Sequence, residues 1–311
     1  MAQQRPSCGN TTMHDVVVYL SSLPRIADRN RKIEVLRSFA AGAESQGLKT
    51  LVQDQRQVVA ARLAVILGWV GASIRGPHIQ LRQDVIDQQA RSGNKIMSID
   101  GSCFKFADPH SVFLRYSLDG VYYNTNNYAN QRSDENHWTQ ISRTLGLTML
   151  PWRQSGRHIL VCLQRDGGWS MKGTDMAQWT TETVTHLRRV THRPILIRSH
   201  PKAPVDLRHL LALPDVSQSL PDSSLQDDIR DAWASVFFNS SSCVASILAG
   251  VPVIAQDEDC VAWEVAEHDL NKIESPHMPD RTQWLHDLSA AHWTDEQSKQ
   301  GLIMKKFQSW L

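Results

Sequence analysis

Apolar runs and helix-like segments alternate along the first half of the chain. The runs are rich in β-branched residues, which is typical of buried strands, and they span residues 15–20, 48–54, 63–70 and 95–100. Two intervening segments carry apolar residues at helical spacing and stop at Gly47 and Gly93. This alternation predicts βαβ units around a parallel sheet, with 63–70 central because that run is wholly apolar.

The same alternation returns in the second half, after a connection at 151–158. Strands are expected at 158–164, 194–201, 231–239 and 252–256, and helices at 175–191, 205–213 and 243–250. Residues 101–150 break the pattern and predict an elaborated loop or hairpin followed by a helix at 137–146, whereas residues 280–311 predict two helices. The chain is therefore expected to be α/β, with two Rossmann-like doubly wound domains facing a cleft and C-terminal helices crossing back. The expected divisions are 1–152, 153–295 and 296–311.

Composition narrows the class of protein. A length of 311 residues suits two domains, and 41% hydrophobic with 21% charged residues is typical of a globular protein. The formal net charge of +1 makes no bulk electrostatic case for nucleic acid or membrane. No run of about 18 apolar residues predicts a membrane span, and the N-terminus lacks a signal-peptide pattern. The five cysteines show no CxxC spacing, so we expect reduced thiols and a cytoplasmic protein without a membrane partner.

Polar residues follow the first strand of the second half. Gln164 and Arg165 end this strand, and Gly167 and Gly168 allow a tight turn whose N–H groups would form a nest for phosphate or carboxylate. A plain surface turn explains the same glycines. Because ligands of such sheets bind at the carboxyl ends of strands, the functional interpretation also stands.

Two further strand ends carry groups suited to an anion. Arg198, His200 and Lys202 gather positive charge after one strand, although a single histidine is often only a structural hydrogen-bonding group. Asn239 and the serines Ser240, Ser241 and Ser242 precede the 243–250 helix, where hydroxyls and N–H groups favour anions. Helix capping is the alternative, but a cap is worth about 1 kcal/mol and needs only one serine.

An acidic segment follows the last strand of the second half. Residues 257–259 read Asp-Glu-Asp, and Glu264 and Glu267 come shortly after. A carboxylate at this place would accept hydrogen bonds from both hydroxyls of a ribose, whereas a solvated helix face is the alternative. Taken together, the strand ends predict a cleft with a phosphate cradle and a sugar-hydroxyl acceptor, which is a nucleotide-sugar site.

Three blocks in this order carry a resemblance to a known family: LVCLQRDGGWSM, ILIRSHPK and FNSSSCVASILAGVPVIAQ. The stretch His158 to Trp293 resembles the donor domain of GT-B glycosyltransferases, especially capsular-polysaccharide types and related bacteriophage-encoded proteins. The resemblance implies that His200 and Ser240 to Ser242 hold the nucleotide phosphates and that Glu264 holds the ribose. It implies an acceptor-side domain over 1–152, a donor domain over 153–295, and hexosyl or pentosyl transfer from a UDP-sugar.

The segment 268–297 resembles phage proteins that glycosylate modified bases. It implies a hydroxymethylated base in DNA as the acceptor, and an infected bacterial cell as the location if the chain is phage-encoded. The basic stretch with Arg25, Arg29, Arg31 and Lys32 would then follow a DNA backbone, although a solvated helix start explains it equally.

The chemistry expected is independent of metal, and no cofactor is expected. No Asp-x-Asp motif stands where a metal would be useful, so Arg, His and N–H groups are expected to stabilise the leaving diphosphate. An inverting enzyme needs a base, and Asp100 at the end of the 95–100 strand is the candidate, with a turn or cap role as the alternative. His137 is a poorer candidate because it stands at a predicted helix start.

Three other functions remain open on the sequence. A surface-polysaccharide acceptor fits the same reaction class. A nucleotide-sugar 2-epimerase shares the architecture but needs several acidic groups in the cleft. A non-catalytic module that binds nucleotide or DNA would use the same residues without turnover.

Overall fold

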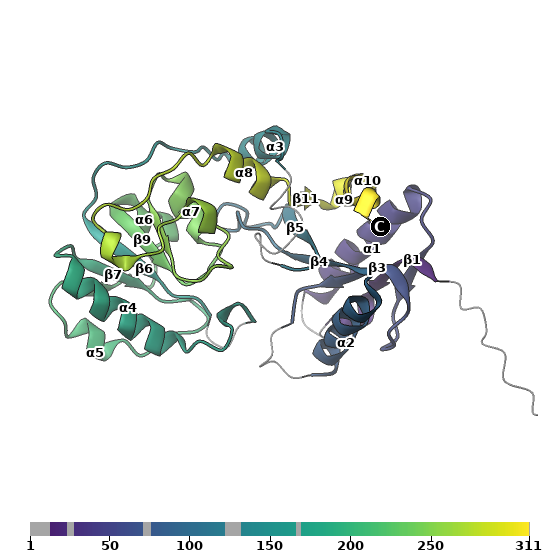
Figure 1. The fold of residues 1–311 in the computed structure, drawn as a ribbon, viewed down its shortest axis with the longest axis horizontal. Helices are drawn as coiled ribbons and strands as arrows, with labels where there is room; N and C mark the ends of the chain where they lie inside the picture. Colours follow the sequence, from purple (N-terminus) through teal and green to yellow (C-terminus); the bar gives the residue numbers. More distant parts are fainter. Residues whose placement is uncertain (1–12, 24–27, 71–75, 122–131, 166–168, 311) are drawn as a thin grey trace, which may run out of the picture.

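The computed structural model describes residues 13–23, 28–70, 76–121, 132–165 and 169–310, which form two α/β units lying side by side (Figure 1). The first unit is built on a six-stranded sheet of order β11-β5-β4-β3-β1-β2. The second unit is built on a five-stranded sheet of order β10-β9-β6-β7-β8. The expected fold class, two Rossmann-like units with C-terminal helices crossing back, is confirmed.

Four neighbouring strands of the first sheet are parallel: β1 (His14–Tyr19), β2 (Thr50–Gln53), β3 (Ala61–Leu67) and β4 (Lys95–Gly101). Strand β3 lies between β1 and β4, as its apolar run predicts, and its residues 63–66 are fully buried. Helices α1 (Arg29–Ser45) and α2 (Pro77–Ser92) connect these strands. Gly93 ends α2 in the left-handed conformation, with φ 65°, which glycine adopts without strain.

Two antiparallel strands complete the first sheet. β5 (Phe113–Leu118) pairs with β4, and β11 (His292–Thr294) pairs with β5. The expected pair of C-terminal helices is wrong, because the segment folds as α8 (Thr282–Ser289), β11, α9 (Asp295–Lys299) and α10 (Leu302–Phe307). The expected division at residue 295 likewise falls after the chain has re-entered the first sheet. A three-residue strand has no periodicity of its own, and only a distant partner makes it a strand.

The second sheet is wholly parallel. Its strands are β6 (His158–Cys162), β7 (Ile195–Arg198), β8 (Val216–Gln218), β9 (Ala232–Phe237) and β10 (Val253–Ala255). Its helices are α4 (Met176–Val190), α5 (Arg208–Leu211), α6 (Leu225–Arg230) and α7 (Cys243–Leu248). The sequence pattern missed β8 and α6, which are short and largely polar. The strand order reverses between β6 and β9, so the crevice at their carboxyl ends is where this fold binds ligands.

The C-terminal segment packs against α1 of the first unit. Ile303, Met304 and Phe307 are buried in the same apolar cluster as Leu36 and Phe39. Gly42 allows α1 and α9 to approach closely, since a Cβ at this position would lie 1.9 Å from the carbonyl oxygen of Ser298. The first unit therefore depends on both ends of the chain.

An apolar cluster joins the two units. It combines Cys103, Phe104 and Phe113 of the first unit with residues of α7 and α8. Helix α3 (Asn136–Leu145) packs beside α8, and Figure 1 shows both above the space between the sheets. The remaining short 3₁₀ turns are Leu20–Ser22, Trp169–Met171, Trp263–Val265, Leu270–Lys272 and Gln308–Trp310. Among the described helices, none is long and apolar enough to span a membrane.

Candidate functional site

A cavity of about 350 Å³ opens at the carboxyl ends of β6, β7 and β9. His200 and the loop Ser240 to Ser242 line it from the second unit. Lys105 and Phe106, in the loop after β4, line it from the first unit. We call this space the donor cavity, because it contains the groups expected to hold phosphates.

The serine loop presents hydroxyls rather than helix N–H groups. Ser242 is the N-cap residue of α7 but makes no side-chain cap bond. The amides of residues 243, 244 and 245 donate to the carbonyls of residues 240, 241 and 242. The expectation of free N–H groups at this helix start is therefore wrong, because a tight first turn satisfies them. The Oγ atoms of Ser240 and Ser242 lie 2.7 Å apart on the cavity wall.

His200 is half-buried and neutral at pH 7. Burial, followed by the charges of Arg165 and Lys202, lowers the pKa of its ring below the ordinary value of 6.5. Its Nδ1 accepts a hydrogen bond of 3.1 Å from the amide of Lys202. The proton of the neutral ring therefore lies on Nε2, which makes that atom a donor for a ligand oxygen.

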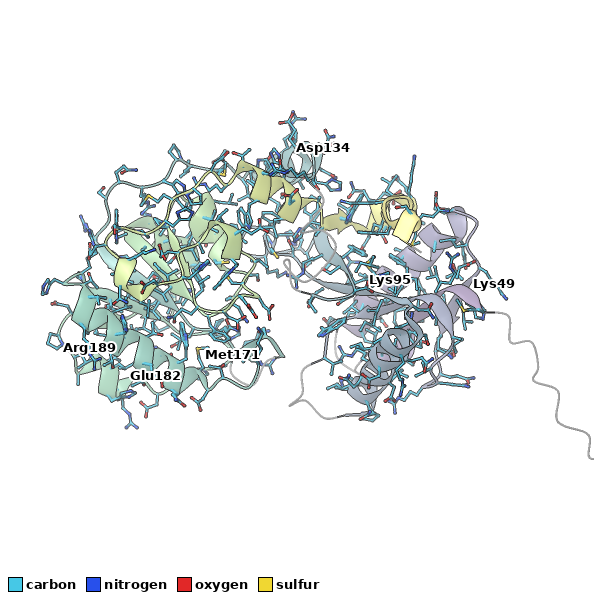
Figure 2. The ribbon with its side chains drawn as sticks, in the orientation of Figure 1. Lys49, Lys95, Asp134, Met171, Glu182 and Arg189 are labelled. Carbon is cyan, nitrogen blue, oxygen red and sulfur yellow. The ribbon has the colours of Figure 1, made fainter. Side chains whose placement is uncertain are left out.

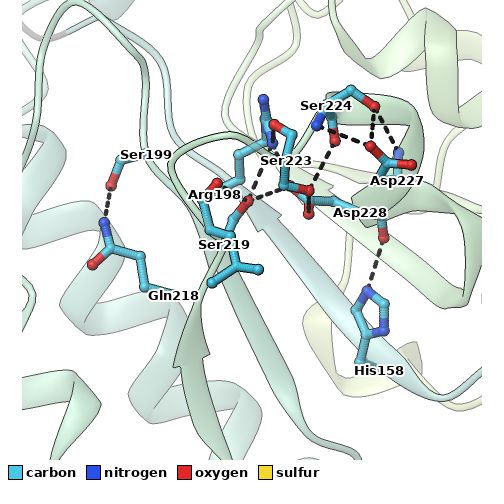
Figure 3. Close-up of polar contacts among 10 residues, drawn as sticks. His158, Arg198, Ser199, Gln218, Ser219, Ser223, Ser224, Asp227 and Asp228 are labelled. Atoms are coloured by element: carbon cyan, nitrogen blue, oxygen red, sulfur yellow. Dashed lines mark hydrogen bonds and ion pairs between the residues drawn. The ribbon is translucent and has the colours of Figure 1, made fainter.

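Arg198 lines the donor cavity, but its charge is already balanced. Its guanidinium donates to the carboxylate of Asp228, to Oγ of Ser219 and to the carbonyl of Ser223 (Figure 3). Asp228 is 6% exposed, so this is a buried ion pair with its own hydrogen bonds. The expectation that Arg198 meets phosphate charge is not supported. Lys202 is exposed and does not line the cavity.

The side chains of Gln164 and Asn239 hydrogen-bond to each other and do not line the donor cavity. Nε2 of Gln164 donates to Oδ1 of Asn239 at 2.8 Å, and the backbone N–H of Asn239 donates to Oε1 of Gln164 at 3.2 Å. Nδ2 of Asn239 also donates to the carbonyl of Ser170 and to the carboxylate of Asp257. Both side chains are buried, so they position the loops after β6 and β9 instead of binding a ligand directly. The expected nest at Gly167 and Gly168 lies outside the described residues.

The acids after β10 do not face the donor cavity. Glu264 is exposed, lines neither of the cavities described here, and has a carboxyl whose pKa is raised by burial and by Asp287. The expected ribose contact at Glu264 is therefore not supported. Asp257 and Asp259 form ion pairs with Lys172. Within the described ranges, no three His, Cys, Asp or Glu side chains gather as a metal site.

A second cavity, of about 790 Å³, lies at the carboxyl ends of the first sheet, and we call it the acceptor cavity. Asp100, at the end of β4, lines it together with Trp69 and Arg82. Oδ1 of Asp100 accepts the amide of Gly101 at 2.7 Å, and Oδ2 lies 3.7 Å from Nη2 of Arg115. Asp100, the expected base, therefore lines a cavity. Its bond to the amide of Gly101 also fits the alternative role in a turn.

Two contacts connect the cavities. Arg165 belongs to the second unit yet lines the acceptor cavity, and its charge acts on His200 in the donor cavity. Arg115 lies beside Asp100, and its Nη1 is 3.2 Å from Sγ of Cys103, which lines the donor cavity. Arg165 and Arg115 therefore relate the candidate base at one cavity to the candidate phosphate-binding residues at the other.

The basic stretch at the start of α1 lies at the acceptor cavity. Arg31 and Lys32 line it, and they form ion pairs with Asp295 and Asp28. Arg29 is not among the residues lining the cavity, and Arg25 lies outside the described residues. Paired cations in a hollow are a poor track for a duplex backbone, so this stretch does not support the expected DNA contact.

His137, the poorer candidate for the base, lines neither the donor cavity nor the acceptor cavity. Its ring packs edge-on against Trp293 at a centroid distance of 4.3 Å. Burial, with a contribution from Lys306, lowers its pKa to about 4.

Sequence reasoning missed Lys105, Phe106, Arg82 and Arg115. The loop after β4 follows a strand end, so the rule applied to the second half would have singled out Lys105. Arg115 carried no such signal, because it lies inside β5 and meets Asp100 only through antiparallel pairing.

No family model and no curated protein matches the sequence. Two solved structures from Thermosulfurimonas dismutans share its fold. The KpsC β-Kdo 2,7 transferase has a TM-score of 0.55 at 14% identity, covering 94% of this chain and 99% of that one. The KpsC β-Kdo 2,4 transferase has a TM-score of 0.53 at 12% identity, covering 89% of this chain and 90% of that one.

A UDP-GlcNAc 2-epimerase from Methanocaldococcus jannaschii is also similar, with a TM-score of 0.36 at 11% identity, covering 92% of this chain and 84% of that one. That TM-score is too low to bear on the epimerase alternative. At such identities the two KpsC structures establish the fold, and the chain has the two-unit GT-B fold of these glycosyltransferases.

Proposed function

We propose that the protein is a glycosyltransferase that moves a sugar from a nucleotide-sugar to a saccharide hydroxyl. The observation that supports it most is the position of Arg165, which lines the acceptor cavity while its charge acts on His200 in the donor cavity. The donor cavity would take the nucleotide phosphates, and the acceptor cavity would take the hydroxyl.

The reaction follows from these groups. The acceptor oxygen attacks the anomeric carbon, its proton passes to the Asp100 carboxylate, and the bond from that carbon to the phosphate oxygen breaks. Charge grows on the leaving phosphate during this step. Nε2 of His200 and the hydroxyls of Ser240 to Ser242 would donate hydrogen bonds to it.

The acceptor cavity favours a saccharide over a DNA base. At about 790 Å³ it is large enough for a small ligand, and Trp69 and Asp100 offer the aromatic and carboxylate surfaces that sugars use. An epimerase would need several acids near the nucleotide, whereas Asp28 and Asp100 are the only described acids lining either of these cavities. A capsular-type saccharide is therefore our preferred acceptor.

Calorimetry with UDP-, GDP- and CMP-sugars tests the donor half of the proposal. Heat with at least one donor is expected, and no heat with any of them refutes it. Mass spectrometry then tests the acceptor by incubating the binding donor with capsular oligosaccharides and, separately, with hydroxymethylated DNA. A mass gain only in the DNA would overturn the saccharide assignment while keeping the transferase, and donor binding without any product would favour a non-catalytic module.

A further inference from the structure

The donor cavity is poor in uncompensated positive charge. Arg198 is tied to Asp228, and His200 is a neutral donor at pH 7. The serine loop lines it with neutral groups. A nucleoside phosphate carries at least one full negative charge, and a charge taken into a cavity needs a counter-charge or many strong donors. The second-unit residues that line this cavity do not provide that charge, because Arg165 of the same unit lines the acceptor cavity and Lys202 does not line the donor cavity.

Among the described residues that line this cavity, Lys105 is the remaining cation, and it belongs to the first unit. Its Nζ donates to Oγ of Ser111 and to the carbonyl of Asp108, both of which are neutral acceptors. Within the described part of the chain, no carboxylate forms an ion pair with it. An ammonium has three donors and a flexible stem, so one contact is easily exchanged for a phosphate oxygen.

The loop that carries Lys105 is held firmly on both sides. Before it, the amide of Cys103 donates to Nε2 of His292 at 3.0 Å. After it, the buried carboxylate of Asp108 accepts the amides of Val112 and Phe113 at 2.8 and 2.9 Å. These bonds fix where the stem of Lys105 begins.

The same loop also contacts the second unit. The carbonyl of Phe106 accepts a 2.9 Å hydrogen bond from Nε2 of Gln226, which lies in α6 and lines the donor cavity. Lys105 is the sequence neighbour of this contact, and it lines the same cavity as the serine loop and His200.

We infer that Lys105 of the first unit binds the phosphate of the nucleotide-sugar across the donor cavity and neutralises the charge that develops when the sugar leaves. This inference rests on the proposed function and adds a specific residue to it. It also makes donor binding a property of both units, since the second unit lines the cavity with neutral donors and the first unit lines it with a cation.

Binding of nucleoside phosphates and of their parent nucleosides separates this role from a general effect on the fold. The probes are UMP, UDP, CMP and GDP, each compared with uridine, cytidine or guanosine by calorimetry. Lys105→Ala is expected to weaken binding of the preferred nucleoside phosphate about 10- to 100-fold and to leave nucleoside binding unchanged, because a hydrogen bond to a charged group is lost. Lys105→Arg, which keeps the charge, is expected to retain most of the affinity.

Lys49→Ala is the matched control. Lys49 is an exposed lysine of the first unit that lies on the side away from the second unit (Figure 2). Its variant should bind both classes of probe as the wild type does, and thermal unfolding should show that all variants are folded.

Unchanged phosphate affinity in Lys105→Ala, alongside a clear loss in His200→Ala, would overturn the inference while leaving the proposed function in place. An equal loss for nucleoside and nucleoside phosphate would also overturn it, since the loop and not the charge would then be responsible. If the wild type binds none of the phosphates, the proposed function itself fails and the inference with it.

Discussion

Arg198 and Asp100 both lie at the carboxyl end of a strand, yet their neighbours in the tertiary structure differ. The guanidinium of Arg198 forms an ion pair with the buried carboxylate of Asp228, so its charge is already balanced. Asp100 keeps a looser partner, since Nη2 of Arg115 lies 3.7 Å away, and it lines the larger cavity. The position of a residue at a strand end therefore identifies candidates, and its neighbours decide which of them can meet a ligand.

Replacing Asp100 by Asn tests its role as the base. The amide keeps the size of the side chain but cannot take a proton, so kcat is expected to fall by about 10²- to 10⁴-fold. Donor affinity measured by calorimetry should stay at the wild-type value, because Asp100 does not line the donor cavity. Asp84→Asn, on the exposed face of α2, should leave both quantities unchanged. An Asp100→Asn enzyme with wild-type kcat would exclude the residue as base.

His292 makes the stability of the junction sensitive to acid. Its ring is fully buried, and Nε2 accepts the amide of Cys103, so Nδ1 carries the proton and donates to the carbonyl of Leu288. Burial, followed by the charge of Arg115, lowers its pKa to about 3. A proton on Nε2 would remove the acceptor of the Cys103 amide, so the folded protein requires the neutral ring.

The sign of the pH effect follows from these states. The unfolded histidine titrates near pH 6.5 and the folded one near 3, so the unfolded chain binds the proton first. The contribution of His292 to the free energy of unfolding is complete above pH 6.5 and falls by about 1.4 kcal/mol per pH unit as acid is added. Denaturant unfolding between pH 7 and 5 should show this loss for the wild type.

His292→Gln should flatten that dependence, because an amide oxygen can still accept the Cys103 amide but does not titrate. Part of the slope should remain, since His137 is also buried with a lowered pKa of about 4. His110→Gln, at an exposed position, should keep the wild-type slope. A wild-type slope in His292→Gln would contradict the assignment.

At the scale of elements, the long helices and central strands follow from local pattern. The apolar spacing of α1 places Leu36 and Phe39 in the core, and the wholly apolar β3 lies inside the sheet as expected. The short strands β8 and β11 do not follow from pattern, because each contains three residues and exists only through pairing with a neighbour. The loop after β4 is similar, since only contacts with His292 and Gln226 make it part of the site.

Gly42→Ala tests the close contact of α1 with α9. A methyl group would meet the Ser298 carbonyl at 1.9 Å, so the two helices must separate. The free energy of unfolding is expected to fall by about 1–3 kcal/mol, although alanine is the better helix former. Arg37→Ala, on the exposed side of the same helix, should change it by less than about 0.5 kcal/mol. Equal denaturation midpoints for Gly42→Ala and the wild type would show that the contact is not as close.

At the scale of the whole molecule, residues from the C-terminal part of the chain complete the sheet and the core of the first unit. β11 forms one edge of its sheet, and α10 adds Ile303, Met304 and Phe307 to its core. The second unit lies between these two parts in the sequence, so the chain passes from the first unit to the second and back again. The shared apolar cluster around Cys103 and Phe104 also joins the units. The donor cavity is a product of this arrangement, because its two walls come from different units.

Phe307→Ala tests whether the C-terminal helix stabilises the first unit. The side chain is fully buried, so its removal should lower the free energy of unfolding by about 3–5 kcal/mol. Leu302→Ala is the control in the same helix, because Leu302 is 39% exposed and should cost far less. A denaturation midpoint for Phe307→Ala close to that of Leu302→Ala would mean that α10 is dispensable.

The sequence by itself determined the two-unit α/β fold, the order of the main elements and the strand ends that meet at the site. Those features depend on local periodicity, turn residues and the rule that ligands bind at the carboxyl ends of parallel strands. Only the tertiary structure decided which polar groups remain for a ligand. The charge of Arg198 is balanced by Asp228. The side chains of Gln164 and Asn239 hydrogen-bond to each other, and Lys105 lines the donor cavity from the first unit. Pairing of charges and hydrogen bonds depends on distances between segments remote in sequence, and a local pattern does not contain those distances.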